Sequence, residues 1–145
     1  MATIEASLVI NRPIDKVFAY VTDSGSWPQW EDGLLKVEQT SKGPMGVGTT
    51  FRGENQALGR RMEWTSEVTE YKPRRKWGQK ITSKSWSTEK RLIFVSVEGG
   101  TRLTLISKLE ISGFLRLITP IVVRTMQKKI EGNLTNLKNI LEAHA

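Results

Sequence analysis

Few residues of this chain could carry out nucleophilic or acid–base chemistry, and the sequence excludes several classes of reaction. The 145 residues contain no cysteine and a single histidine, His144, which stands beside the last residue, where chains commonly fray. Thiolate catalysis, cysteine-ligated metals and disulfides are therefore excluded, and zinc hydrolase and Ser-His-Asp chemistry are effectively excluded. The remaining candidates for proton transfer are Tyr20, Tyr71 and the carboxylates.

The carboxylates of the most regular predicted strand face away from the expected core. Residues 61–71 alternate between apolar and polar types, as a strand with one wet face does. Glu63 and Glu67 lie on the wet face, with Arg61. The opposite face carries Met62, Trp64, Ser66 and Val68. Because the pattern places no acid and base together on an inward face, we assign no catalytic residue. We also expect no metal and no cofactor.

Positive charge is concentrated in residues 72–91. This stretch has eight Lys or Arg residues against one acidic residue, and its balance of +7 equals the formal net charge of the whole chain. The pattern favours a solvated positive face, with contact to anionic lipid headgroups as the second interpretation and RNA binding as the third. Alternation separates Trp77 from Lys76 and Lys80, so ring and charge would not meet a base and its phosphate together. Nucleic acid is therefore the less favoured partner.

The elements that must position these side chains follow from the periodicity of apolar residues. Residues 3–10 alternate as a strand, and Pro13 begins a short helix that ends near Asp23. Residues 34–111 carry strand and turn signals, and a long helix is predicted over 121–143. Its apolar stripe consists of Val123, Met126, Ile130, Leu134, Leu137 and Leu141. The length and composition fit one domain.

Two tryptophans stand between the short helix and the next predicted strand. Trp27 and Trp30 lie in residues 24–30, a segment rich in turn-forming residues. Apolar rings of this size in a loop usually plug the end of a core, so we expect a structural role for both.

Two glycines, Gly99 and Gly100, predict the pairing of the last two strands, residues 86–98 and 101–111. A two-residue turn at these glycines sets Glu98 opposite Thr101. We place Phe94 and Leu105 on the inner face because that face carries more apolar bulk along both strands.

The inward positions of these elements are mostly apolar or aromatic, which is typical of a site for a hydrophobic guest oriented by a few polar groups. Ser66, Gln79 and Thr88 are the polar candidates. The expected lining residues are Phe51, Met62, Trp64, Ser66, Trp77, Trp86, Phe94, Leu103, Leu105, Met126 and Ile130. The alternative is that these side chains fill the core and leave no cavity.

The order of the elements and a set of short motifs resemble the helix-grip fold of START-related, birch-pollen-allergen-like proteins. The chain is most similar to the polyketide cyclase/dehydrase and lipid transport group, over essentially its whole length. The motifs are Ile10 with Pro13, Trp27-Pro28-x-Trp30, Val47-Gly48-Thr49-Thr50-Phe51, Gly100-Thr101-Arg102-Leu103-Thr104, Gly113-Phe114 and Leu134-x-x-Leu137-Lys138-x-x-Leu141-Glu142. The resemblance implies an α+β fold in one domain over 1–145. A curved seven-stranded antiparallel sheet would wrap around a long C-terminal helix, with two short helices after the first strand.

The resemblance also implies a function. Similar proteins bind lipids, polyketides or aromatic metabolites in a cavity between sheet and helix, and a minority are metal-free cyclases or dehydratases; the fold alone does not choose between them. In such proteins the segment around Phe114 and Ile118 borders the entrance, so both residues join the expected lining, as a lid or a portal that touches a membrane. We expect a cytoplasmic protein, because no apolar stretch approaches about 20 residues and no secretory signal is present. The oligomeric state stays open.

Overall fold

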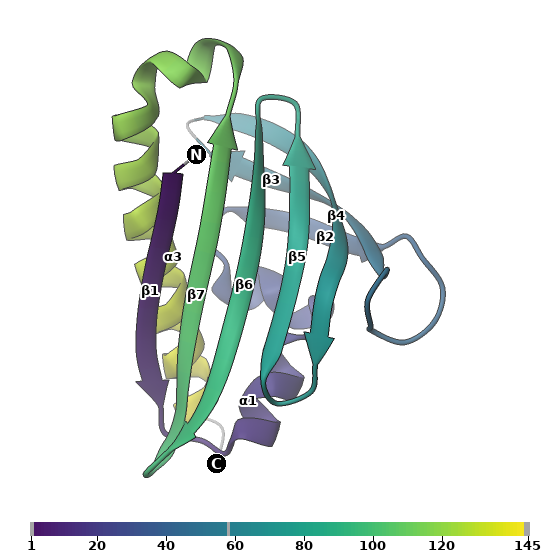
Figure 1. Cartoon of the computed structure of the whole chain (residues 1–145), viewed down its shortest axis with the longest axis vertical. Coiled ribbons are helices and arrows are strands. Elements are labelled where there is room, and N and C mark those ends of the chain that lie inside the picture. Colours follow the sequence, from purple (N-terminus) through teal and green to yellow (C-terminus); the bar gives the residue numbers. More distant parts are fainter. Residues whose placement is uncertain (1, 58, 144–145) are drawn as a thin grey trace.

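An antiparallel sheet and a long C-terminal helix form the two sides of the molecule (Figure 1). The computed structural model describes residues 2–57 and 59–143. The strands are β1 (Ala2–Ile10), β2 (Leu34–Gln39), β3 (Thr50–Ala57), β4 (Arg60–Lys72), β5 (Lys76–Ser83), β6 (Trp86–Val97) and β7 (Gly100–Ile111). The helices are α1 (Ile14–Val21), the 3-10 turn η1 (Ser24–Ser26), α2 (Trp27–Trp30), the 3-10 helix η2 (Gly113–Ile118) and α3 (Thr119–Ala143).

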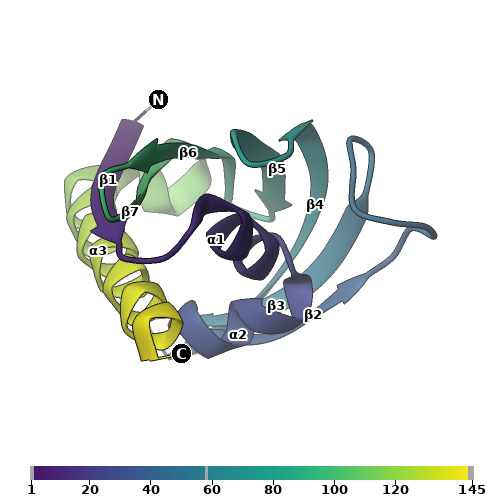
Figure 2. The same cartoon turned by 90° about the horizontal axis from the view of Figure 1, so that it is seen from below.

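The seven strands run in the order β1-β7-β6-β5-β4-β3-β2, and all neighbours are antiparallel. Although β1 and β2 are consecutive in sequence, they form opposite edges, because α1, η1 and α2 cross the hollow of the curved sheet between them (Figure 2). The helix α3 has 25 residues and extends about 37 Å at 1.5 Å per residue. The helix-grip architecture predicted from the resemblance is confirmed.

Alternation along the strands decides which side chains enter the interior. On β4, Trp64, Ser66 and Val68 are buried, whereas Glu63 and Glu67 are exposed. The predicted inner and outer faces of this strand are therefore confirmed. On α3 the buried residues Ile130, Leu134, Leu137 and Leu141 follow the helical repeat of the expected stripe.

The turn between β6 and β7 lies one residue earlier than predicted, which shifts the pairing register of the two strands by two residues. Val97 pairs with Gly100 and Phe94 with Leu103, so the turn consists of Glu98 and Gly99, where Gly99 has φ +82°. Gly100 belongs to β7 because it pairs with Val97, and the position requires glycine because a Cβ there would lie 2.1 Å from the carbonyl oxygen of Ile10. A shift of two residues preserves the alternation, so Phe94 and Leu105 are both buried on the inner face as predicted.

Aromatic side chains close one end of the interior. The ring centroids of Trp27 lie 5.0 Å from Phe51 and 5.5 Å from Trp77, and Phe18 lies 5.0 Å from Phe94. The indole Nε1 of Trp27 donates a 2.7 Å hydrogen bond to the carbonyl oxygen of Val21. The prediction that the tryptophans of the turn-rich segment plug the end of the core is confirmed.

No helix in residues 2–57 and 59–143 combines the length and the apolar character needed to cross a membrane.

Candidate functional site

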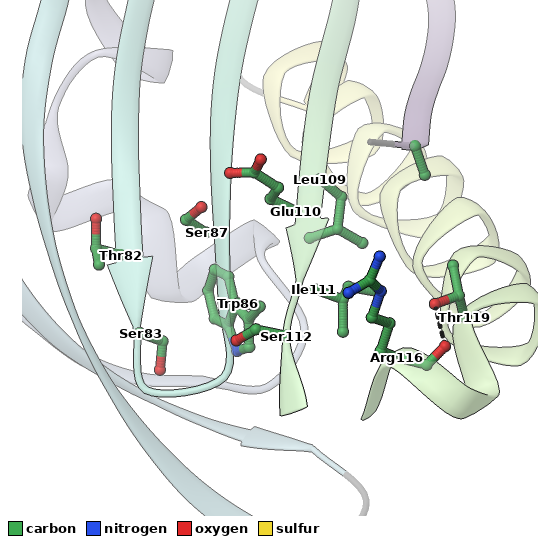
Figure 3. Close-up of a pocket in the computed structure, with 11 residues that line it drawn as sticks. Thr82, Ser83, Trp86, Ser87, Leu109, Glu110, Ile111, Ser112, Arg116 and Thr119 are labelled. Atoms are coloured by element: carbon green, nitrogen blue, oxygen red, sulfur yellow. Dashed lines mark hydrogen bonds between the residues drawn. The ribbon is translucent and has the colours of Figure 1, made fainter. Parts of the chain in front are cut away.

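The candidate site lies at the end of the sheet opposite α1 and α2. There the ends of β5 and β7 and the start of β6 meet η2 and the first turn of α3 around an open pocket of about 690 Å³ (Figure 3). The pocket is lined by Ala2, Thr82, Ser83, Trp86, Ser87, Leu109, Glu110, Ile111, Ser112, Arg116 and Thr119. This volume is within the range of small-molecule sites, which is roughly 300–1,000 Å³.

The apolar wall of this pocket comes from the inner face of β6 and β7. Trp86 and Ile111 are cross-strand partners, and Leu109 lies on the same face of β7 two residues before Ile111. Figure 3 shows Leu109, Ile111 and Arg116 between β7 and α3. The Thr119 hydroxyl donates a 2.8 Å hydrogen bond to the carbonyl oxygen of Arg116, which fixes the junction of η2 and α3.

The predicted lining residues divide between this pocket and the rest of the interior. Trp86 lines the pocket. Met62, Ile118 and Met126 are partly exposed, and the side chain of Phe114 lies outside the described part of the structure. The buried members of the set are Phe51, Trp64, Ser66, Trp77, Phe94, Leu103, Leu105 and Ile130. Contact of these residues with a guest stays a prediction.

Most residues of the pocket lining were not predicted from the sequence. Leu109 and Ile111 share alternation parity with Leu105, so the inner face of β7 could have been extended to both residues. Arg116 and Thr119 gave no periodic signal because they lie in a 3-10 helix and at its junction with α3.

Lys90 corrects the interpretation of residues 72–91 as one solvated positive face. It lies on the inner face of β6, four residues before Phe94, and its side chain is only 12% exposed. Its Nζ lies 3.3 Å from Glu31 Oε1, at the end of α2, and 5.6 Å from the ring centroid of Trp30. Lys90 and Phe94 are four residues apart, so alternation along the strand places both on the inner face. The net charge of residues 72–91 does not show this position.

The other basic residues of the stretch lie on the surface or at its margin. Arg91 pairs with Glu70 at 3.1 Å, and Lys72 lies 4.0 Å from the same carboxylate. Lys80 is exposed while Trp77 is buried on the opposite face of β5. The predicted separation of ring and charge on this strand is confirmed.

Three buried polar atoms have no hydrogen-bond partner among the described residues: Ser66 Oγ, Trp77 Nε1 and Gln79 Oε1. All three belong to the inner face of β4 and β5. In contrast, the neighbouring hydroxyls of Thr88 and Ser107 bond each other at 2.5 Å. Buried polar groups are usually paired, so these three unpaired atoms mark an unusual part of the interior.

Tyr20, a candidate for proton transfer, lies away from the pocket, on α1. Its hydroxyl donates a 2.5 Å hydrogen bond to Gln29 Oε1. Burial, and then the negative charge of Asp23, raise the pKa of Tyr20 above its usual value. The phenol is therefore neutral at physiological pH. Among the residues that the structure describes, no three His, Cys, Asp or Glu side chains are grouped closely enough to hold a metal ion.

Comparison with known proteins adds a family and a set of similar structures. A family model described as polyketide cyclase / dehydrase and lipid transport matches residues 1–142. No significant match was found among curated protein sequences.

The similar structures share the fold at low sequence identity. TTHA0849 from Thermus thermophilus is 21% identical, with a TM-score of 0.85 and coverage of 99% of this chain and 100% of that chain. The ZhuI aromatase/cyclase from Streptomyces sp. R1128 is 17% identical, with a TM-score of 0.79 and coverage of 97% and 93%. Ara h 8.0201 is 13% identical, with a TM-score of 0.76 and coverage of 99% of each chain.

Proposed function

The chain belongs to the polyketide cyclase / dehydrase and lipid transport family, and from that premise we propose that it binds a small hydrophobic molecule between the sheet and α3. The guest is a lipid, a polyketide or an aromatic metabolite. The observation that carries this proposal is the 690 Å³ pocket whose inner wall is formed by Trp86, Leu109 and Ile111. Burial of apolar guest surface contributes about 25 cal/mol per Å², and this is the main source of affinity for such a wall.

Binding is a better account of this pocket than catalysis. Glu110 and Arg116 are the ionisable residues of its lining, and both are exposed. A general acid or base that works near neutral pH is commonly buried or set beside a charged neighbour. The cyclase or dehydratase alternative has no such pair in the pocket lining.

A probe-binding titration tests the proposal. N-phenylnaphthylamine is neutral and fluoresces more strongly in apolar surroundings, and we expect it to bind saturably to the wild-type protein. Ile111→Trp adds bulk inside the pocket and should weaken probe binding about tenfold or more, which corresponds to about 1.4 kcal/mol. Equal affinity of Ile111→Trp and wild type would contradict the proposal.

Val95→Trp is the matched control for that variant. Val95 lies on the outer face of β6 and is 48% exposed, so the same new side chain there projects into solvent. We expect wild-type probe affinity. Mass spectrometry of a solvent extract of the purified protein would then identify any guest retained from the cell.

We also propose that the junction of η2 and α3 contacts an anionic membrane while the guest enters. Leu117 is 79% exposed and Ile121 is 64% exposed, and Arg116 and Arg124 flank them in sequence. Apolar side chains beside cations favour an anionic lipid surface. Co-sedimentation with vesicles that contain phosphatidylserine, and none with phosphatidylcholine alone, is the expected result. A cytoplasmic location stays a prediction from the sequence.

A further inference from the structure

Lys90 occupies the boundary between the pocket and the aromatic end of the interior. On the sheet it stands directly opposite Gln79 of β5 and Ser107 of β7. Two residues after Lys90 on β6, Leu92 is fully buried at the aromatic end of the interior. Two residues before Lys90, Thr88 lies opposite Leu109, which lines the pocket. The Lys90 side chain then crosses from β6 to the end of α2, where it meets Glu31.

The hydrogen-bonding capacity around Lys90 is only partly used. An ammonium group has three N–H donors, and Lys90 Nζ makes one hydrogen bond among the described residues, to Glu31 Oε1. Gln79 Oε1 is an unpaired acceptor, and Ser66 Oγ can either donate or accept. Gln79 is the cross-strand partner of Lys90, and Ser66 lies on the diagonal from Gln79 across β4 and β5. Long side chains on such partners and diagonals are within reach of one another, so one small polar group can contact all three.

Glu31 determines which polar group can be accepted. It already balances the charge of Lys90 at 3.3 Å. A carboxylate guest would bring a second negative charge beside Glu31, and like charges repel strongly where water is excluded. A neutral carbonyl or hydroxyl oxygen can use the spare donors of Lys90 without separating the ion pair.

We propose that Lys90, Gln79 and Ser66 form a polar subsite for a neutral ketone or hydroxyl group of the hydrophobic guest, and that Glu31 makes this subsite reject carboxylates. This inference rests on the proposed function, because the apolar part of the guest occupies the pocket. From Leu109 to Ser107 the distance along β7 is about 7 Å, at roughly 3.4 Å per residue. A guest of two fused rings spans this distance.

The subsite is reached by side-chain movement. Gln79 Oε1 and Ser66 Oγ are covered by neighbouring side chains. Ile81 and Thr88 form the row between Gln79 and the pocket, and Ser66 lies in that same row, beside Ile81. Both residues must move for a guest to reach Gln79 Oε1, and Ile81 must move for it to reach Ser66 Oγ. Ile81 is partly exposed, so it has room to do so.

The test uses four matched compounds, measured by isothermal titration calorimetry: naphthalene, acetylnaphthalene, naphthol and naphthoate. For the wild-type protein we expect acetylnaphthalene and naphthol to bind about tenfold more tightly than naphthalene, and naphthoate to bind more weakly than acetylnaphthalene by a similar factor. Lys90→Met keeps the apolar stem but removes the donors, so the advantage of acetylnaphthalene should disappear while naphthalene affinity is retained. Glu31→Gln should raise naphthoate affinity about tenfold.

Two further variants make the result decisive. Lys80→Met removes an exposed lysine from the neighbouring strand and should leave all four affinities unchanged. Gln79→Met removes the acceptor and should reduce the affinity of naphthol relative to naphthalene. If Lys90→Met does not fold, Gln79→Met still tests the subsite. The polar subsite is refuted, and the apolar pocket is not, if naphthalene binds but the oxygenated compounds bind no more tightly. The same conclusion follows if Lys90→Met and Gln79→Met leave all four affinities unchanged. If none of the four compounds binds, the proposed function itself fails.

Discussion

The two ends of the interior are built from the same sheet but are filled differently. At the closed end, Phe51, Trp77 and Phe94 are at most 3% exposed and pack against Trp27 or Phe18. At the open end, Trp86 and Ile111 remain partly exposed beside the 690 Å³ pocket. Side chains alternate between the two faces of the sheet in the same way at both ends, so the difference in packing comes from the helices that cover each end.

The covering elements differ in what they bring to the interior. The helices α1 and α2 insert Phe18, Trp27 and Trp30 into the hollow of the sheet. The η2–α3 junction instead leaves Leu117 and Ile121 exposed. An inward tryptophan is therefore core at one end of this sheet and pocket wall at the other.

The largest expected effect comes from a pair of tryptophan substitutions, one at each end. Trp77→Ala opens a cavity against Trp27 and should lower the free energy of unfolding by about 3–5 kcal/mol. Trp86→Ala removes a side chain that already borders open space, so its cost should be no more than about half as large, while probe binding in the pocket weakens. Urea unfolding monitored by circular dichroism measures both. Equal losses of stability would mean that the two ends are equally packed.

A smaller effect is expected at two glycines. A Cβ at Gly100, near the closed end, would lie 2.1 Å from a backbone oxygen of Ile10. Gly100→Ala must therefore move β1 or β7, and we expect a loss of about 1–3 kcal/mol. At the open end, Gly113 has φ +67°, and apart from its chain neighbours no atom of the described residues lies within 4 Å of the place where a Cβ would stand. Gly113→Ala should therefore cost only the conformational penalty, about 1 kcal/mol.

Thermal unfolding of both glycine variants provides the comparison. If Gly113→Ala were the more damaging substitution, close packing would not be the feature that separates the two ends.

The smallest expected effect is a pH dependence at the closed end. A hydrogen bond from Lys138 Nζ, at 2.6 Å, and one from the backbone N–H of Asn11, at 2.8 Å, lower the pKa of Glu142 below its ordinary value of 4.5. Because folding lowers this pKa, the contribution to stability is fully present above pH 4.5 and is lost as the pH falls through the folded-state pKa.

Urea midpoints for wild type and Glu142→Gln, compared at pH 7 and pH 3, measure this contribution. The wild type should lose more stability than the variant between the two values. The same loss in both proteins would show that Glu142 does not act in this way.

Much of the fold could be predicted because it depends on local repetition. The alternation in β4 placed Trp64 and Ser66 inside, and the helical stripe placed Leu134 and Leu137 against the sheet. The β6–β7 turn was misplaced because two adjacent glycines look equivalent in sequence. Only the close approach of Ile10, ninety residues away, shows that Gly100 is needed within the strand.

The site was less predictable. Lys90 was grouped with surface cations because a lysine is usually solvated, although its long apolar stem can cross a buried region when the ammonium finds a partner. That partner, Glu31, is fifty-nine residues away. Arg116 and Thr119 belong to a 3-10 helix and a helix start, for which no alternation exists to follow.

The amino-acid sequence by itself determined which side chains face inward, since the repeats of strand and helix are properties of consecutive residues. Only the tertiary structure decided which part of that inward face is packed solid and which part borders a pocket. The packing of the interior depends on contacts between segments that are distant in sequence, such as the ring contact of Trp27 with Trp77 and the hydrogen bond of Lys90 to Glu31. The local periodicity of apolar residues does not predict such contacts.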